Sequence, residues 1–523
     1  MPDRVVFHPH DASPRHLEDA NALLRGRFQF AGKSVEISDA SIFDKPPPSE
    51  AWVKSLHGFE WLAPLSAAGG EPARRLATNL TAQWLKRYPR YAEPAWLPEV
   101  MASRLINIFA HGRFVLANSD VLWRSKLLMS LREQSRMLAR IATDSPDGLP
   151  RFKAAAAYAL SGACLNDSPQ RLNAGLAMLQ AEIARQILPD GGHASRSPEA
   201  LLRAHNLLLM VSDAMMAIAH ETPIAIRNAH DRTAPMLRFF RLGDGALATF
   251  NGGRAGDAKM IEGTLARDTV RGKPFTFAPH SGYHRLTAGR GILVVDCGTV
   301  PAGVFANNVH AGCLSFEFSA GNHRVIVNCG APASWQKQWG SSLRATAAHS
   351  TITLADTSMA KILSGSAARL LGPRLLGGPT TVQSNRRETP QGFLIESSHN
   401  GYEPQFGIIH ERRLSLSSDG SRLGGADRLM RTTQSRRAVP FTARFHIHPD
   451  VRVTPNQGGG FLLRVPGGGE GWRFQAAGGE VVVEESIYFG DNSARKSEQL
   501  VISGTMGPEP VELDWSLERI AVG

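Results

Sequence analysis

The chain has 523 residues, of which 42% are hydrophobic and 20% are charged, which excludes a disordered protein. This length exceeds what one hydrophobic core usually holds, so two or more domains are expected. The formal net charge is +11, and arginine is the main basic residue. This charge favours an acidic partner, and the alternative is a basic surface without a function. Zinc-finger, RNP and long Lys/Arg patterns are missing from the sequence, which argues against nucleic acid.

The N-terminal residues MPDRVVFHPHDASPRH contain no apolar core and no small-residue cleavage site, so no signal peptide is expected. The sequence contains no stretch of about 18 apolar residues, so no membrane-spanning helix is expected either. These two features alone predict a cytoplasmic protein. The four cysteines form no CxxC pair and are predicted to be buried free thiols: Cys164, Cys297, Cys313 and Cys329.

The first half of the chain has a helical pattern. Residues 1–50 are irregular apart from GRFQFAGKSVEI (26–37), whose alternation predicts a short hairpin. From residue 51 to about 225, apolar residues recur at spacings of three and four, as in LLMSLREQSRMLARIAT (127–143). Ser197-Pro198-Glu199 has the composition of a helix start. Several amphipathic helices over this length predict a bundle or an α/α toroid.

The pattern changes between residues 222 and 240, where we expect the domain boundary. From residue 235 to 523 the chain consists of short β-rich runs separated by Gly, Asn and Asp, such as GILVVDCG, CLSFEFS and EVVVEES. Many short strands with frequent turns predict a large antiparallel sandwich. The predicted fold class is therefore α+β with two domains.

Three segments contain residues suited to chemistry. The first, QILPDGGHASRSPEA (186–200), is a polar loop between two helices that offers Asp190, His193 and Arg196. The alternative is that Asp190 and Ser197 only cap helices.

The second and third segments place histidines near strands. Strand alternation in NNVHAGCLSFEF would put Asn308, His310 and Gly312 on one face, with Asn328 near the end of the next strand. His349 precedes a further strand, with Arg344 upstream. Histidine is a common metal ligand and a natural general base, although a lone strand histidine is more often a hydrogen-bonded core residue.

Two tyrosines lie in glycine-flanked turns. Tyr283 follows Ser-Gly and Tyr402 follows Asn-Gly, in a chain that has only six tyrosines. A tyrosine in such a turn is notable, although a structural role is the default.

With these residues identified, the chain resembles the heparinase II/III family of polysaccharide lyases over nearly its whole length. DGGHASRSP resembles the Ser-Pro helix start of the family's helical domain, and HAGCLSFEF, VIVNCG and LRATAAHST follow the order and spacing of its β domain. The resemblance implies an N-terminal α/α toroid, here incomplete, followed by a large antiparallel β-sandwich.

The resemblance also implies β-elimination on an acidic, uronic-acid-containing polysaccharide or oligosaccharide, with action in the cell envelope or periplasm. In such lyases a His or Tyr removes the proton next to the sugar carboxylate, a Tyr protonates the leaving oxygen, and Asn, His or Arg donors neutralise the carboxylate. The candidate catalytic residues are His193, Tyr283, His310 and Tyr402, and the candidate substrate-binding residues are Arg196, Asn308 and Arg344.

The chain departs from the family pattern at several positions. The family's His-x-His-x-Asp motif is occupied by Asn308, His310 and Gly312, and Ala200 replaces a common Tyr. Two functions therefore stay open: a lyase with altered catalytic residues, and a catalytically degenerate glycan-binding or envelope-biogenesis protein.

Some family members hold a structural zinc through two His and an Asp. His310 and His349 match the two His positions, and Asn328 stands at the Asp position. A neutral amide oxygen is a weaker zinc donor than a carboxylate, so we expect weak zinc binding or none, and no required cofactor.

Overall fold

The computed structural model describes residues 4–12, 17–38, 41–117, 119–165, 167–268, 274–332, 339–467, 469–490 and 493–522. The chain divides into two compact units. The first comprises Met1–Ile187 and Arg203–Asp231, and the second comprises Leu188–Leu202 and Arg232–Gly523.

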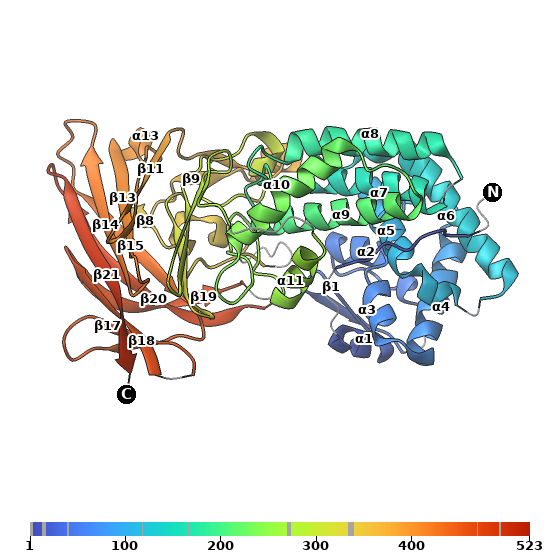
Figure 1. Cartoon of the computed structure of the whole chain (residues 1–523), viewed down its shortest axis with the longest axis horizontal. Helices are drawn as coiled ribbons and strands as arrows, with labels where there is room; N and C mark the ends of the chain where they lie inside the picture. Colours follow the sequence, from blue (N-terminus) through green and yellow to red (C-terminus); the bar gives the residue numbers. More distant parts are fainter. Residues whose placement is uncertain are drawn as a thin grey trace. The chain divides into compact units, whose positions relative to one another are not determined.

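The first unit is helical apart from one hairpin. Its helices, two of which continue into the second unit, are α1 (Leu17–Leu24), α2 (Glu50–His57), α3 (Leu62–Ala68), α4 (Gly70–Arg87), α5 (Pro98–Leu116), α6 (Val121–Ile141), α7 (Leu149–Leu165), α8 (Pro169–Gln186), α9 (Pro198–Ala217) and α10 (Ile224–Phe240). Short 3-10 turns lie at η1 (Ile42–Asp44) and η2 (Ala142–Asp144). The hairpin pairs β1 (Arg27–Phe30) with β2 (Lys33–Glu36), as the alternation of residues 26–37 predicts. Figure 1 shows these helices in blue to green.

Buried aromatic rings and alanines form the core of the helical unit. Trp84 stacks on Trp96 with ring centroids 6.4 Å apart, and Trp52, Trp61 and Phe59 are buried with them. The alanines of α7 are fully buried, so α7 can pack closely against α5 and α8. A helix that is apolar on nearly every side is expected at such a central position.

The predicted domain boundary is wrong in detail. Helix α10 runs through the segment 222–240, where the sequence predicted that helices end. The division into units falls inside both α9 and α10, so each of these helices contains residues of both units. Pro235 lies inside α10 without ending it, so a proline could not be used as a stop signal here.

The second unit consists mainly of antiparallel strands, coloured yellow to red in Figure 1. Their bounds are β3 (Phe277–Ala278), β4 (Tyr283–Ala288), β5 (Gly291–Asp296), β6 (Phe316–Ala320), β7 (His323–Val327), β8 (Ile352–Leu354), β9 (Ala360–Ile362), β10 (Leu375–Gly377), β11 (Val382–Thr389), β12 (Gly392–His399), β13 (Ile408–Ser417), β14 (Arg422–Arg431), β15 (Val439–Ile447), β16 (Arg452–Pro455), β17 (Phe461–Arg464), β18 (Gly469–Ala477), β19 (Glu480–Tyr488), β20 (Arg495–Met506) and β21 (Val511–Val522). Shorter elements are α11 (Ala258–Ala266), α12 (Gly365–Leu371), α13 (Glu403–Phe406), η3 (Gly303–Ala306), η4 (Ser342–Arg344) and η5 (Thr346–Ala348).

Two large sheets form a sandwich, as predicted. One has the order β11-β12-β13-β14-β21-β18-β17-β16, and the other has the order β19-β20-β15-β7-β6-β5-β4-β3, with β8 also paired to β15. Rings from both sheets meet in the core: Phe316 on β6 stacks on Trp515 of β21 with an interplanar angle of 4°, and Phe445 lies 4.8 Å from Trp515. This aromatic layer fixes how the two sheets pack.

One strand prediction is wrong. Residues 307–315 form no strand, and β6 begins only at Phe316. Leu314 has a φ of 59°, and the Ser315 amide donates to the Gly312 carbonyl, so the chain turns where strand alternation was expected. Asn308, His310 and Gly312 are therefore placed by a loop and not by strand parity.

The four cysteines are buried and free, as predicted. In the part of the chain that the structure describes, no helix has the length and apolar character needed to cross a membrane.

Candidate functional site

All nine residues that the sequence nominates lie in the second unit. They are His193, Arg196, Tyr283, Asn308, His310, Asn328, Arg344, His349 and Tyr402. The structure joins some of them and separates others.

His310 and His349 are neighbours, as predicted. His310 Nδ1 lies 3.1 Å from His349 Nε2, and His349 Nδ1 lies 2.9 Å from the Ala345 carbonyl oxygen. Because a carbonyl only accepts, His349 carries its proton on Nδ1, and its Nε2 accepts the Nδ1–H of His310. This leaves a lone pair on His310 Nε2, and the residue is 7% exposed. His310 can thus act as a proton acceptor.

Burial keeps both imidazoles neutral. Desolvation lowers the pKa of His310 well below its usual value, and the neighbouring His349 and Arg344 lower it further. Desolvation likewise lowers the pKa of His349 to about 4. A neutral His310 has a lone pair that can accept a proton, but its lowered pKa makes it a weak base near pH 7 and leaves it unsuited to donate a proton.

Arg344 supports the loop beside His310. Its guanidinium donates to three main-chain carbonyls, those of Val309 at 2.9 Å, Ala306 at 3.1 Å and Pro373 at 2.5 Å. Burial lowers the pKa of Arg344 to about 10. The expectation that Arg344 binds a sugar carboxylate is therefore wrong, because its donors hold the loop that carries His310.

Arg196 is also structural. It forms a buried ion pair with Asp296, donates from Nε to the Ser281 carbonyl at 2.7 Å, and lies over the Tyr283 ring at 4.8 Å. Desolvation alone would lower the pKa of Arg196, but the negative charge of Asp296 opposes this effect, and the pKa is raised overall. The predicted sugar contact at Arg196 is wrong, because a carboxylate of the protein already occupies this guanidinium.

Tyr283 is fully buried, and its hydroxyl donates to the Arg196 carbonyl at 2.8 Å. The same hydroxyl accepts from Asn251 Nδ2 at 2.7 Å, and the Asn251 carboxamide oxygen accepts the His310 amide at 3.2 Å. Burial raises the pKa of Tyr283 well above its usual value. Tyr283 therefore positions the His310 loop through Asn251 and is not exposed to a substrate.

Asn251 is not among the residues that the sequence nominates. Its only local signal is the Asn-Gly-Gly run at 251–253, and Asn251 adopts a φ of 50°, which Asn tolerates better than most residues. Nothing in that run predicts a bond to a residue far along the chain.

The remaining candidates are Tyr402, His193 and Asn308. Tyr402 is 1% exposed, and its hydroxyl donates to the Ile352 carbonyl at 2.7 Å. His193 is buried in a tight turn, where the Ser195 amide donates to its Nδ1 at 3.1 Å, and burial lowers its pKa to about 4. Asn308 is exposed, two residues from His310. Burial and the bond to Ile352 give Tyr402 a structural role.

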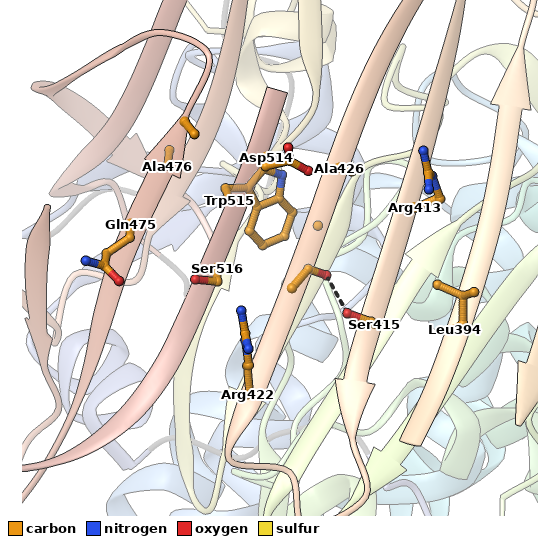
Figure 2. Close-up of a pocket in the computed structure, with 13 residues that line it drawn as sticks. Leu394, Arg413, Ser415, Arg422, Ala426, Gln475, Ala476, Asp514, Trp515 and Ser516 are labelled. Carbon is orange, nitrogen blue, oxygen red and sulfur yellow. Dashed lines mark hydrogen bonds between the residues drawn. The ribbon is translucent and has the colours of Figure 1, made fainter. Parts of the chain in front are cut away.

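A groove of about 570 Å³ lies on the outer face of the eight-stranded sheet, away from these residues (Figure 2). Its floor includes Gly424 and Ala426 of β14 and Ser516 of β21. Its arginines are already paired, with Arg413 lying 3.1 Å from Glu512. None of the nominated residues lines this groove.

Comparison with known proteins places the fold in a family. The model of the heparinase II/III-like C-terminal domain matches residues 270–516. FtsZ-localized protein C of Caulobacter vibrioides (strain NA1000 / CB15N) is 32% identical over 532 residues, covering 99% of this chain and 91% of that protein. The chain belongs to the heparinase II/III-like family.

Solved structures agree with this fold at low sequence identity. The crystal structure of heparinase III has a TM-score of 0.73 at 13% identity, covering 97% of this chain and 85% of that one. A mutant of heparan sulfate lyase HepC from Pedobacter heparinus has a TM-score of 0.66 at 15% identity, covering 98% of this chain and 86% of that one. The two-domain fold, with a toroid and a β-sandwich, is that of these structures.

An Asp at position 312, as in the family pattern, would require the His349 ring to move. A Cβ built on Gly312 would lie 2.6 Å from His349 Cδ2. The His349 ring can thus lie close to position 312 because glycine has no side chain there.

The donor set at the family's zinc position does not fit a metal. The side-chain oxygen Oδ1 of Asn328 accepts the main-chain N–H of Ser350 at 3.0 Å. The main-chain N–H of Asn328 donates to the Glu317 carboxylate at 3.1 Å. His349 Nε2 is already used by His310. Within the described ranges, no third His, Cys or carboxylate groups with this pair. Weak zinc binding or none stays a prediction, which elemental analysis of the purified protein would test.

Proposed function

We propose that this protein is a catalytically degenerate member of the heparinase II/III-like family that serves envelope biogenesis as a binding protein associated with FtsZ. One observation carries the proposal: the groups that β-elimination would need are engaged inside the protein. Arg196 and Arg344 are saturated by internal partners, and the hydroxyls of Tyr283 and Tyr402 are buried on main-chain carbonyls.

The chemical reason is that β-elimination needs three functions together. A base removes the proton, an acid protonates the leaving oxygen, and cationic or amide donors neutralise the carboxylate. Here His310 offers a base, but the nominated acids and cations are not available beside it. A lone base without carboxylate neutralisation leaves the α-proton weakly acidic.

The relatives support the same proposal. The FtsZ-localized protein is 32% identical over nearly the whole chain, whereas the lyase structures are 13–15% identical and share the fold alone. Association with FtsZ is therefore the most specific functional expectation for this chain.

A weak lyase is the second candidate, and His310 favours it. Its neutral Nε2 retains an unused lone pair, and Asn308, two residues away in the sequence, is exposed. In this reading His310 removes the proton and Asn308 contacts the uronate of an acidic polysaccharide.

Two assays on the full chain separate these candidates. The first follows ultraviolet absorbance of unsaturated uronate with a panel of acidic polysaccharides, using His310→Ala as the matched control. The second measures co-sedimentation with FtsZ polymers, with unpolymerised FtsZ as the control. We expect co-sedimentation and no absorbance change. An absorbance rise that His310→Ala abolishes would overturn the proposal in favour of a lyase.

Localisation also stays a prediction, with the cell envelope and the cytoplasm as the two expectations. A fluorescent fusion would test it, since an FtsZ-associated protein concentrates at the division site and a freely diffusing one does not.

A further inference from the structure

The second unit carries an exposed loop, residues 360–377, which we call the leucine loop. Strands β9 and β10 pair antiparallel at its base, with Ala360 opposite Gly377 and Ile362 opposite Leu375. Helix α12 lies between these strands and has no buried residue. The loop therefore presents a helical turn to solvent on a two-stranded stem.

Three leucines of this loop are exposed where an apolar side chain is normally buried. Leu370 is 84% exposed, Leu371 is 47% exposed and Leu376 is 46% exposed, whereas Leu375 beside them is buried at 4%. A cluster of exposed leucines in a folded protein marks an interaction surface when no part of the chain covers it.

The charged residues of the sequence around these leucines have one sign. Between Asp356 and Glu388 the sequence contains no acidic residue. In the loop itself Lys361, Arg369 and Arg374 form no ion pair among the residues that the structure describes. Lys361 and Arg369 are therefore available to pair with an acidic partner, whereas Arg374 already donates to the Leu371 carbonyl.

Hydrogen bonds hold the leucine loop in one conformation. Arg374 Nε donates to the Leu371 carbonyl at 2.9 Å, and Arg344 Nη1 donates to the Pro373 carbonyl at 2.5 Å. The Leu363 amide donates to the Arg374 carbonyl at 2.9 Å. A surface that is already ordered loses less conformational entropy when it binds.

We propose that the leucine loop is a docking surface for an acidic protein segment whose apolar side chains cover Leu370 and Leu371 and whose carboxylates pair with Arg369 and Lys361. The inference rests on the proposed association with FtsZ and names the surface and the chemistry of its partner. Apolar burial supplies affinity, and the charge pairs supply selectivity and association rate.

A protein segment fits this surface better than a lipid bilayer. The tip of the loop is Ser364-Gly365-Ser366, all exposed, and α12 begins without a side-chain cap on its first amides. Inserting such a tip into hydrocarbon would strip water from unsatisfied main-chain groups. A docked segment on the leucines leaves those groups in water.

The test compares variants of the full chain in co-sedimentation with FtsZ polymers. Leu370→Ser/Leu371→Ser removes the apolar contact, and Arg369→Glu reverses one charge. The matched controls lie on the same unit: Val482→Ser replaces another exposed apolar residue, 39% exposed, and Arg519→Glu reverses another exposed cation. Thermal midpoints of all variants check that the fold is intact.

We expect the double leucine variant and Arg369→Glu each to weaken FtsZ binding by about tenfold or more, with the controls unchanged. Unchanged binding by both loop variants, while wild type binds, would overturn the docking surface and leave the FtsZ association standing. Failure of the wild type to co-sediment would sink both. Flotation with phosphatidylglycerol vesicles that the leucine variant abolishes would replace the protein partner with a membrane and overturn the proposal.

Discussion

An arginine that binds carboxylates can contact either a substrate or another residue of the protein. A guanidinium binds a carboxylate bidentately, so Arg196 was a reasonable candidate for a sugar contact. In the folded protein the carboxylate is Asp296, and the pair is buried under the ring of Tyr283. At this position the arginine stabilises the fold.

Removing that arginine should therefore affect stability. Arg196→Ala leaves the Asp296 carboxylate buried without its counter-charge, so the free energy of unfolding should fall by about 3–5 kcal/mol. Urea denaturation measures it. Arg519→Ala, at an exposed position, is the control and should change stability by no more than about 0.5 kcal/mol. Equal effects at the two positions would contradict the structural role of Arg196.

His57 makes stability depend on pH. Desolvation lowers its pKa to about 4, with Arg104 adding to the effect, and its Nδ1 accepts the indole N–H of Trp84 at 3.1 Å. The folded pKa lies below the unfolded value of about 6.5, so as pH falls the unfolded chain takes up the proton first. The stability contribution is present at pH 7 and is lost as pH falls from about 6.5 toward 4.

The size of this effect is about 2 kcal/mol between pH 7 and pH 5. His57→Gln keeps an acceptor and cannot titrate, so its free energy of unfolding should fall by about 2 kcal/mol less than that of wild type over this range. Denaturation at a series of pH values checks this. Identical pH slopes for the two proteins would show that His57 titrates normally in the fold.

At the scale of elements, two glycines allow α7 and α8 to approach closely. A Cβ on Gly162 would lie 2.5 Å from Leu172 Cα, and one on Gly175 would lie 2.5 Å from the Ala159 amide nitrogen. Backbone atoms cannot move aside as a flexible side chain can, so these glycines set the distance between the two helices.

Alanine at two helical glycines should therefore have opposite effects. Gly175→Ala overpacks the α7–α8 contact and should cost about 1–3 kcal/mol. Gly263 in α11 has no atom within 4 Å of an added Cβ, so Gly263→Ala should stabilise by up to about 1 kcal/mol through helix propensity. Thermal unfolding of both variants measures the contrast, and destabilisation at both positions would refute it.

At the scale of the whole molecule, the second unit includes a segment that precedes the last part of the first unit, residues 203–231. Asp190 accepts the Ser281 amide at 2.6 Å, and Glu199 pairs with Arg254 at 2.6 Å. The segment Leu188–Leu202 thus belongs to the sandwich unit, although the sequence between it and residue 232 does not.

This division predicts how fragments behave. A fragment of residues 235–523, cut at the boundary that the sequence suggested, lacks the segment 188–202 and leaves Asp296 unpaired. We expect it to be aggregated or to melt well below a fragment of residues 188–523, as followed by near-ultraviolet circular dichroism. Equal thermal midpoints for the two fragments would show that the segment is dispensable.

The sequence by itself determined the class of each half of the chain. Apolar residues at helical spacing predicted α6, α7 and α8, Ser-Pro-Glu predicted the start of α9, and alternation predicted the sandwich strands, because these signals act between near neighbours. The family resemblance followed from local runs such as HAGCLSFEF. The pairing of His310 with His349 was also predictable, since both positions belong to one family pattern.

Only the tertiary structure decided what the candidate residues do. Whether Arg196 meets a sugar or Asp296, and whether Tyr402 faces solvent or the Ile352 carbonyl, depends on partners far away in the sequence. The same holds for Asn251, because no local sequence pattern predicts that it accepts the main-chain N–H of His310. The physical reason is that periodicity reports which face of an element is apolar, whereas the identity of a polar partner is set by long-range packing that periodicity does not encode.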